Sequence, residues 1–284
     1  MSTRLEEALS AALKRAEEQA PPRLAAALSH AVFPGGARVR PRLCLAVAAA
    51  CGDRNPALTD AVGAALELLH CASLVHDDLP CFDDANTRRG RPSVHRAFGE
   101  PLAVLTGDAL IVLAFETLGR AGASHPTLLA PMLLRLTQAV GAPRGIVAGQ
   151  AWESEPSAPL ELYHASKTGA LFTAATTLGA MSCGVSGDGW HELGARLGAA
   201  YQVADDLLDA LEDPTASDKP VMRDQANDRP NAVARLGAQG AVARLRHLVD
   251  EALEAIPPCE GREGLSSLVQ QIAQRLVPVS LRAA

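Results

Sequence analysis

Apolar residues recur at three- and four-residue spacing along almost the whole chain, and no segment shows sustained alternation of apolar and polar positions. The first spacing places apolar side chains on one face of an α-helix, whereas strands would need the alternation that is missing. β-Branched and aromatic residues, which favour strands, are sparse. The pattern therefore predicts an all-α fold. No stretch has the composition of an interdomain linker, so we expect a single domain over residues 1–284.

Caps and breakers divide this pattern into separate helices. Thr3 followed by Glu6 forms a capping box at the start of the first helix, which Pro21 and Pro22 end. A long helix begins near residue 58 and runs to about residue 79, where Pro80 disfavours its continuation. We expect further helices reaching residue 32 and at 38–51, 99–121, 126–140, 143–155, 159–184 and 188–212, two or three more after 231, and polar loops at 83–92 and 214–230.

Composition and charge narrow the class of protein. A chain of 284 residues is long enough to bury most of its apolar surface, and a net charge of −6 without a basic tail argues against nucleic acid as the main partner. The longest uninterrupted apolar run, 43–51, is less than half of the ~20 residues that a spanning helix needs. The start of the chain lacks the apolar core of a signal peptide. We therefore expect a soluble, cytoplasmic protein without a membrane span.

The cysteines give no sign of a disulfide framework or a zinc site. They lie far apart, no C-x-x-C pair occurs, and they sit in apolar helical segments. We interpret them as reduced residues of the core, which suits a cytoplasmic protein. They are Cys44, Cys51, Cys71, Cys81, Cys183 and Cys259.

Two segments concentrate aspartate on otherwise apolar helices. The segment 70–84 carries Asp77, Asp78, Asp83 and Asp84, and the segment 201–209 carries Asp205, Asp206 and Asp209. The three carboxylates of the second segment share one helix face within about one turn. Asp77 and Asp83 are too far apart around an ideal helix to share a face, so we expect the chain after Pro80 to curl Asp83 back toward Asp77.

This arrangement predicts a site for Mg²⁺ and diphosphate. Acidic residues at helix ends are often only solvated caps, but here the neighbours are apolar, the cluster occurs twice, and basic residues follow each copy. Mg²⁺ takes one or two protein carboxylates and completes its shell with water and substrate phosphate. Arg88 and Arg89 follow the first cluster and Lys219 follows the second, and both residue types bind phosphate. Two facing Asp-rich helix ends would hold a diphosphate between them.

With these motifs in this order, the sequence resembles the trans-prenyl diphosphate synthases of the polyprenyl synthetase family. The likeness runs from Gly35 to Arg229 and is strongest to bacterial geranylgeranyl diphosphate synthases of carotenoid pathways. It implies a bundle of long helices around a central apolar cavity, assembled as a homodimer. It also implies a Mg²⁺-dependent transferase that condenses isopentenyl diphosphate with farnesyl, geranyl or dimethylallyl diphosphate, giving geranylgeranyl diphosphate and pyrophosphate.

The resemblance also implies a role for each matching position. Mg²⁺, as three ions with substrate bound, would be held by Asp77, Asp78, Asp83, Asp205, Asp206 and Asp209. The allylic diphosphate would be held by Arg88, Lys167, Thr168, Gln202 and Lys219, and isopentenyl diphosphate by Arg40, His70 and Arg89. The residues expected to carry catalysis are Asp77, Asp78, Asp83, Arg88, Lys167, Asp205 and Lys219.

Two positions depart from the family pattern. The lysine that normally contacts isopentenyl diphosphate in the Gly-Gly-Lys-Arg motif is Ala37 here, and Arg42, one turn beyond Arg38, is a candidate substitute. The usual Gly-Lys after the second motif reads Asp228-Arg229, which keeps the charge but loses the flexible glycine.

Product length is predicted from the residues that precede the first aspartate. Ala72 and Ser73 lie five and four residues before Asp77, about one turn away from the metal end of the same helix. In the family, a bulky aromatic residue here stops elongation at fifteen carbons. These small residues predict a twenty-carbon product, with a farnesyl diphosphate synthase as the alternative.

Other functions remain open at this stage. A class I terpene cyclase shares the first Asp cluster, but its second cluster normally contains Asn and Ser. A non-catalytic partner subunit is left open by Ala37. His76 and Asp77 spell the His-Asp pair of metal phosphohydrolases, but that class needs further histidine ligands, and we interpret His76 as a core or supporting residue. Glu153 and Glu155 are expected by default on a solvated face, although the family often places an acid near Glu153.

Overall fold

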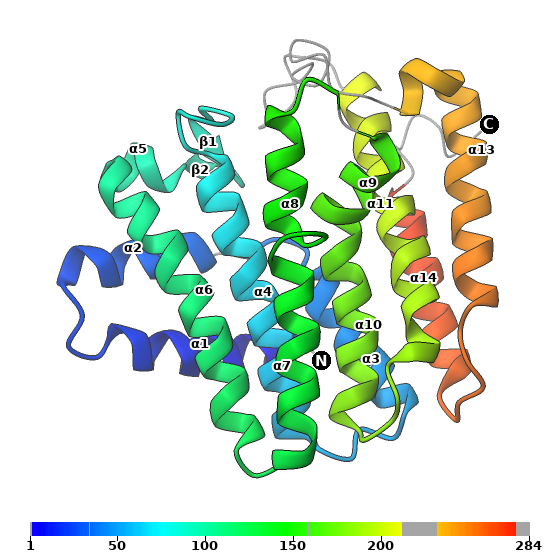
Figure 1. Cartoon of the computed structure of the whole chain (residues 1–284), viewed down its shortest axis with the longest axis horizontal. Coiled ribbons are helices and arrows are strands. Elements are labelled where there is room, and N and C mark those ends of the chain that lie inside the picture. Colours follow the sequence, from blue (N-terminus) through cyan, green and yellow to red (C-terminus); the bar gives the residue numbers. More distant parts are fainter. Residues whose placement is uncertain (1, 34, 158, 212–231, 277–284) are drawn as a thin grey trace.

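Two long helices form the centre of the bundle. In the computed structural model, which describes residues 2–33, 35–157, 159–211 and 232–276, α4 (Pro56–Asp77) and α6 (Glu100–Gly122) make the most extensive contact between any two described elements. On the other side of α4, α3 (Val39–Ala50) and α10 (Ala170–Ser182) pack on it, and α11 (His191–Leu211) and α13 (Ala232–Glu254) follow outward. The long helices run side by side, as Figure 1 shows. The all-α prediction is confirmed.

The remaining elements complete the bundle. α1 (Ser2–Glu17) and α2 (Pro22–Val32) cross the long helices on one side, in blue in Figure 1. The others are β1 (Thr87–Arg88), β2 (Arg91–Pro92), α5 (Val94–Phe98), α7 (Pro126–Val140), α8 (Ile146–Ala151), a 3₁₀ turn at Trp152–Ser154, α9 (Leu160–His164), a π-helical turn at Ala165–Gly169, a 3₁₀ turn at Asp188–Trp190 and α14 (Arg262–Leu276).

The centre of the bundle is packed with leucine and alanine. Leu66, Leu68 and Leu69 of α4 are all fully buried, because this helix is covered by neighbours on nearly every side. A helix that is apolar around its circumference belongs in a core. The mostly small side chains at the contacts allow the backbones to approach closely, so the helix ends are held rigidly in place.

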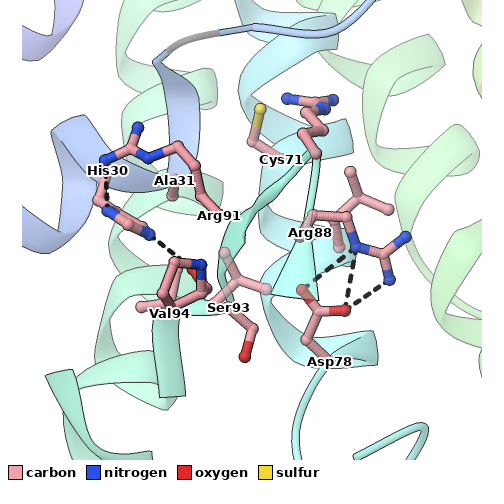
Figure 2. A pocket seen from close by; sticks show the side chains of 12 residues that line it. His30, Ala31, Cys71, Asp78, Arg88, Arg91, Ser93 and Val94 are labelled. Atoms are coloured by element: carbon pink, nitrogen blue, oxygen red, sulfur yellow. Dashed lines mark hydrogen bonds and ion pairs between the residues drawn. The ribbon is translucent and has the colours of Figure 1, made fainter. Parts of the chain in front are cut away.

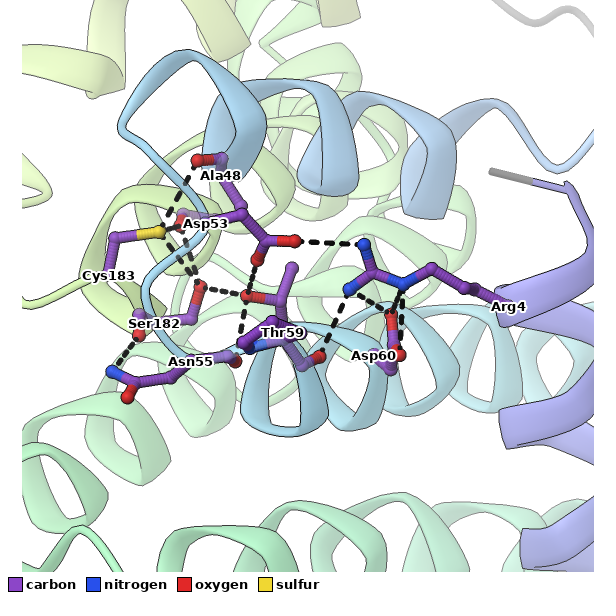
Figure 3. A network of polar contacts seen from close by, with 10 residues as sticks. Arg4, Ala48, Asp53, Asn55, Thr59, Asp60, Ser182 and Cys183 are labelled. Atoms are coloured by element: carbon purple, nitrogen blue, oxygen red, sulfur yellow. Dashed lines mark hydrogen bonds and ion pairs between the residues drawn. The ribbon is translucent and has the colours of Figure 1, made fainter.

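A polar network fixes the N-terminal end of α4, the end opposite the first Asp cluster (Figure 3). Arg4 of α1 donates to Asp60 at 2.9 Å and to Asp53 at 2.8 Å. Thr59 donates to Asp53 at 2.9 Å and shares a hydrogen bond of 2.9 Å with Ser182 at the end of α10. The network joins α1, α4 and α10, so it anchors the helix whose opposite end carries the first aspartate cluster.

Local structure differs from the sequence prediction in several places: Thr3 lies inside α1 and not at its cap, α5 was not expected, and residues 188–190 form a 3₁₀ turn before α11. Three further differences lie near the Asp clusters. The expected polar loop at 83–92 contains an antiparallel hairpin whose two strands are too short to show an alternating pattern. Its turn residues Arg89 and Gly90 have φ of 54° and 71°, the left-handed pair typical of a two-residue hairpin turn. The expected helix at 143–155 begins only at Ile146 and ends in a 3₁₀ turn. The expected helix at 159–184 is interrupted by the π-helical turn, and such turns often mark functional sites.

Two described helices are long and apolar enough to cross a bilayer by length and composition alone. They are α4 and α6, whose most apolar windows are 78% and 44% buried within the fold. Burial of this kind identifies α4 as a core helix. More than half of the α6 window faces outward, so this helix presents an apolar surface.

The cysteines meet the expectation of a helical core only in part. Cys44, Cys71 and Cys183 are buried and Cys51 and Cys259 are partly buried, but Cys81 is exposed. Cys81 lies in the loop after Pro80 and Cys259 in the loop before α14, so neither of these two sits in a helix. All six are free thiols, as expected.

Candidate active site

A cavity of about 1060 Å³ lies between the ends of α4 and α11 and extends toward α6 and α8. Both Asp clusters stand at its mouth, at the C-terminal ends of their helices, where the helix dipole adds negative potential and favours cations. The expected site residues that line it are Arg40, His70, Ala72, Ser73, Asp77, Asp83, Arg88, Arg89, Lys167, Thr168, Gln202, Asp205 and Asp209. Lys219 and Arg229 lie outside the described residues.

The first Asp cluster is built by the end of α4. The helix stops at Asp77, and the backbone N–H of Asp83 donates to the Asp77 carbonyl at 2.9 Å. The expectation that the chain curls Asp83 back toward Asp77 is therefore confirmed. Asp77 Oδ1 is buried without a hydrogen-bond partner, and Lys167 Nζ lies 3.5 Å away from it. Burial raises the pKa of Asp77, while Lys167 opposes the rise. A cation placed against this oxygen would relieve the cost of burying it.

Asp78 points away from this cavity, although it adjoins Asp77. It is buried, and Arg88 donates to its Oδ1 from Nε at 3.0 Å and from Nη2 at 2.5 Å (Figure 2). Burial raises the pKa of Asp78, and the hydrogen bond from Arg88 opposes the rise. The pair fixes the Arg88 side chain in the wall of the cavity. Asp78 is thus bonded to Arg88 and is not among the residues that line the larger cavity; metal ligation by Asp78 stays a prediction from the resemblance.

In the second Asp cluster, too, some carboxylates line the cavity and another is buried away from it. Asp205 and Asp209 line the cavity, whereas Asp206 is buried. Asp206 Oδ1 accepts from Gln202 Nε2 at 3.0 Å, and its Oδ2 accepts from the backbone N–H of Ala232 at 2.7 Å. Thr168 Oγ1 donates to Gln202 Oε1 at 2.6 Å. Asp206 therefore holds Gln202 and the first turn of α13, whereas Asp205 and Asp209 line the cavity.

Lys167 lies in the π-helical turn and is held by a carboxylate that we expected to be solvated. Glu153 forms an ion pair with Lys167 and accepts from Tyr163 Oη at 2.7 Å and from Gln150 Nε2 at 3.0 Å. The expectation for Glu153 is wrong, because the 3₁₀ turn after α8 directs it inward; Glu155 is exposed, as expected. A Cβ on Gly149 would lie 2.4 Å from the Lys167 Cα, so only glycine lets α8 approach this turn.

Arg40 is held by aromatic rings. Its guanidinium carbon lies 5.0 Å from the centre of Phe172 and 5.7 Å from that of Tyr201, and its buried Nε has no hydrogen-bond partner. Stacking against rings positions an arginine without using its N–H groups. Arg40 is therefore ready to donate to an anion in the cavity.

His70 lies beside Arg40 and Arg89. Burial lowers its pKa well below the usual value, and the positive charges of Arg40 and Arg89 lower it further. The imidazole is therefore neutral at pH 7 and can donate one N–H. Arg40, His70 and Arg89 converge on one part of the cavity, as expected for an anion site.

Ala37, the departure in the first motif, and its neighbour Arg38 have different surroundings. Ala37 is exposed at the edge of the cavity, whereas Arg38 is buried and bonded to carboxylates. Arg42 is not among the residues that line the cavity, so the geometry does not support it as a substitute for the missing lysine. His76 also lines the cavity, with Nε2 3.8 Å from Asp108 Oδ1, and so is not a core residue.

The tail end of the cavity is apolar. Ala72 and Ser73 form part of its wall on α4, and Ile111, Val140 and Ile146 also line the cavity. The role of the small side chains at 72 and 73 in setting product length stays a prediction.

Sequence reasoning missed Glu67 altogether. It is 1% exposed within the apolar helix α4 and pairs with Arg38. A single acidic residue inside a long apolar helix is itself a signal, since such a charge is rarely buried unpaired.

The carboxylates fit Mg²⁺ in particular. No group of three His, Cys, Asp or Glu side chains within the described part of the chain could hold a metal ion without other ligands. Mg²⁺ does not need such a group, because water and phosphate oxygens complete its octahedral shell. The unpartnered, buried Oδ1 of Asp77 is a ligand of the type that this ion prefers.

Comparison with known proteins identifies a family model and close relatives that match this chain. A family model described as polyprenyl synthetase matches residues 21–262. The geranylgeranyl diphosphate synthase of Cereibacter sphaeroides is 53% identical over 281 residues, which are 99% of this chain and 98% of that protein. The geranylgeranyl diphosphate synthase of Rhodobacter capsulatus is 50% identical over 284 residues, 100% of this chain and 98% of that protein.

Solved structures share the fold. A farnesyl/geranylfarnesyl diphosphate (FPP/GFPP) synthase from Zymomonas mobilis superposes with a TM-score of 0.80 at 30% identity, over 96% of this chain and 98% of that one. A geranyltransferase from Helicobacter pylori, complexed with magnesium and isoprenyl diphosphate, gives 0.79 at 28% identity, over 96% and 99%. With a family model over most of its length and relatives this similar, the chain belongs to the polyprenyl synthetase family.

Proposed function

We propose that this protein is a Mg²⁺-dependent geranylgeranyl diphosphate synthase. It joins an allylic diphosphate to isopentenyl diphosphate and releases pyrophosphate. The observation that carries the proposal is the cavity itself, which has carboxylates and cations at its mouth and an apolar far end. The high identity to two geranylgeranyl diphosphate synthases supports the same reaction.

The allylic diphosphate binds at the mouth, between the two helix ends. Asp77 and Asp83 from α4, and Asp205 and Asp209 from α11, would hold the Mg²⁺ ions, three of them with substrate bound. When bound, the ions neutralise negative charge on the leaving diphosphate. Lys167, and Arg88 fixed by Asp78, stabilise the same charge as the C–O bond breaks, and Lys219 would join them.

Isopentenyl diphosphate binds beside it. Arg40, Arg89 and His70 hold its diphosphate and direct its double bond toward the allylic carbocation. A new C–C bond forms, and the proton lost from the adduct passes to the pyrophosphate that has just left. The apolar walls exclude water that would otherwise quench the cation.

Product length follows from the tail end of the cavity. Ala72 and Ser73 leave space beyond fifteen carbons, so elongation continues to twenty. The alternative is a farnesyl diphosphate synthase, if another side chain closes the cavity earlier.

The outer face of α6 and α7 supports a homodimer. Val104, Leu105 and Val112 on α6 and Leu134 on α7 are 42–66% exposed, an apolar patch typical of interaction sites. Val104 also lines the cavity, so a second copy docked there would complete its wall. We place the protein in the cytoplasm, where its free thiols stay reduced, and assign its product to carotenoid synthesis by analogy with the family.

One incubation tests the proposal. The purified protein is given Mg²⁺, isopentenyl diphosphate and either dimethylallyl or farnesyl diphosphate, and the dephosphorylated products are sized. We expect the twenty-carbon alcohol from both starters, and none after chelation of Mg²⁺. A fifteen-carbon product that does not elongate would identify a farnesyl diphosphate synthase, a cyclic hydrocarbon a terpene cyclase, and no product a non-catalytic partner subunit.

A further inference from the structure

Glu67 is a buried carboxylate that the reaction described above does not use. It lies in the middle of α4, 1% exposed, with fully buried leucines at 66, 68 and 69. Burying a carboxylate in such surroundings is costly unless cations and hydrogen bonds compensate it. The identity of those cations therefore indicates what Glu67 does.

Two cations, Arg38 and Arg89, lie close to the same carboxylate oxygen of Glu67. Arg38 Nη1 donates to Oε1 at 2.7 Å, and Arg89 Nη2 lies 4.0 Å from that atom. Arg38 is also bonded to Glu6, from Nε at 3.0 Å, and to the carbonyl of Val32 at 3.0 Å. The Arg38 guanidinium is thus engaged in hydrogen bonds to protein groups, and its role is to support the segment that leads into α3.

Arg89 is placed differently. It stands at the tip of the hairpin with φ of 54°, and a Cβ added to Gly36 would lie 2.9 Å from its Nε. Its side chain therefore passes between the backbone at Gly36 and the carboxylate of Glu67. Among the described residues, Glu67 is the single carboxylate within ion-pair distance of Arg89.

The charge count suits an anion site. Glu6 and Glu67 together balance Arg38 and Arg89, and this group lies beside His70, which is three residues further along α4 on the same face. Arg40 then leaves one net positive charge in this part of the cavity. A group that fixes Arg89 without neutralising the site would favour binding of a diphosphate.

We propose that Glu67 is a positioning residue for isopentenyl diphosphate: it holds Arg89 in the orientation in which Arg89 and His70 donate to that diphosphate. The proposal rests on the function proposed above. Glu67 lines the cavity with its carboxylate bonded to Arg38, and it acts on the substrate through Arg89.

The test replaces charge while keeping shape. Glu67→Gln retains an acceptor oxygen for Arg38 and removes the negative charge that attracts both Arg38 and Arg89. We expect KM for isopentenyl diphosphate to rise about tenfold or more, the size of one charge-assisted contact. KM for farnesyl diphosphate and kcat should stay within about twofold of wild type. Glu6→Gln is the matched control, because Glu6 contacts Arg38 and not Arg89.

Two further variants link the effect to Arg89. In an Arg89→Ala background, Glu67→Gln should raise KM for isopentenyl diphosphate by less than twofold. Glu67→Asp keeps the charge one methylene further away, so it should give a KM between those of wild type and Glu67→Gln. An unchanged KM in Glu67→Gln, or an equal rise in Glu6→Gln, would overturn the proposal. If Glu67→Gln fails to fold, Glu67→Asp carries the same test.

Binding and turnover are measured separately. Calorimetry gives Kd for isopentenyl diphosphate in each variant, and wild-type product analysis tests the proposed function. A wild-type protein that binds isopentenyl diphosphate in a Glu67-dependent way but makes no prenyl product would contradict the function and leave the positioning role intact. Product formation together with binding that does not depend on Glu67 would support the function and contradict the positioning role.

Discussion

Arg88 donates hydrogen bonds to both carboxylate oxygens of Asp78, with Nε 3.0 Å from Oδ1 and 3.3 Å from Oδ2. The adjacent Asp77 faces the other way and leaves Oδ1 without a hydrogen bond. Two neighbouring aspartates at the end of α4 therefore have separate tasks. Asp77 faces the cavity, and Asp78 fixes the Arg88 guanidinium in its wall.

Substitution should separate these tasks. Asp77→Ala or Asp205→Ala should lower kcat/KM by about a thousandfold or more with the fold intact, because charge on the leaving group loses its main stabilisation. Asp78→Asn should raise KM for the allylic diphosphate and lower the free energy of unfolding by about 1–3 kcal/mol. The Mg²⁺ concentration for half-maximal activity should change in the first pair and not in Asp78→Asn. Equal Mg²⁺ dependence in all three would contradict the division.

The length of the product should respond to the wall at 72 and 73. Ala72→Tyr places a ring in the apolar end of the cavity, and the product should shorten from twenty to fifteen carbons, as sized by chromatography. Ser73→Phe, at a partly exposed position, provides a second test if the buried site at 72 does not accept the ring. An unchanged product in a folded variant would place the stop elsewhere, for example at Ile111 or Val140.

Restoring the missing lysine should improve binding of isopentenyl diphosphate. Ala37 is exposed at the cavity edge, so Ala37→Lys can place an ammonium beside Arg40 and Arg89 without repacking. We expect KM for isopentenyl diphosphate to fall several-fold in steady-state assays, with KM for the allylic substrate unchanged. Ala11→Lys adds the same charge on the exposed face of α1 and should change neither value. If KM does not fall, the site is already saturated with positive charge.

His70 should make stability depend on pH. Because burial and the arginines lower its pKa in the folded chain, the unfolded chain binds a proton near pH 6.5 and the folded chain does not. The contribution of His70 to the free energy of unfolding is therefore complete well above pH 6.5 and is lost as the pH falls below it, by roughly 1 kcal/mol at pH 5.5. Urea unfolding of wild type and His70→Asn at pH 7.5 and 5.5 measures the difference. Parallel losses in both proteins would exclude this source.

The apolar face of α6 and α7 should hold a second copy. Val112 is 66% exposed on it, and Val112→Asp should convert a dimer to a monomer in light scattering. Leu236→Asp, on α13 and 51% exposed, is the control and should leave the mass unchanged. A monomeric wild-type protein would remove the dimer from the proposal.

The sequence predicted the fold well where spacing and breakers act locally. It placed the ends of most long helices and the curl of Asp83 toward Asp77, because Pro80 decides that geometry within a few residues. It did not separate Asp77 from Asp78, since identical side chains differ only in what the folded chain brings opposite them. Arg88 reaches Asp78 through a hairpin too short to leave a pattern. Glu67 and Glu153 were missed for the same reason: their partners come from distant segments.

The line of hydrogen bonds from Thr168 through Gln202 to Asp206 limits what these side chains can offer a ligand. A threonine hydroxyl has one proton, and here it goes to Gln202 Oε1. The Gln202 amide has two, and one goes to Asp206. A diphosphate can therefore receive only the second amide proton of Gln202, so Thr168 influences the substrate by setting the direction in which that proton points.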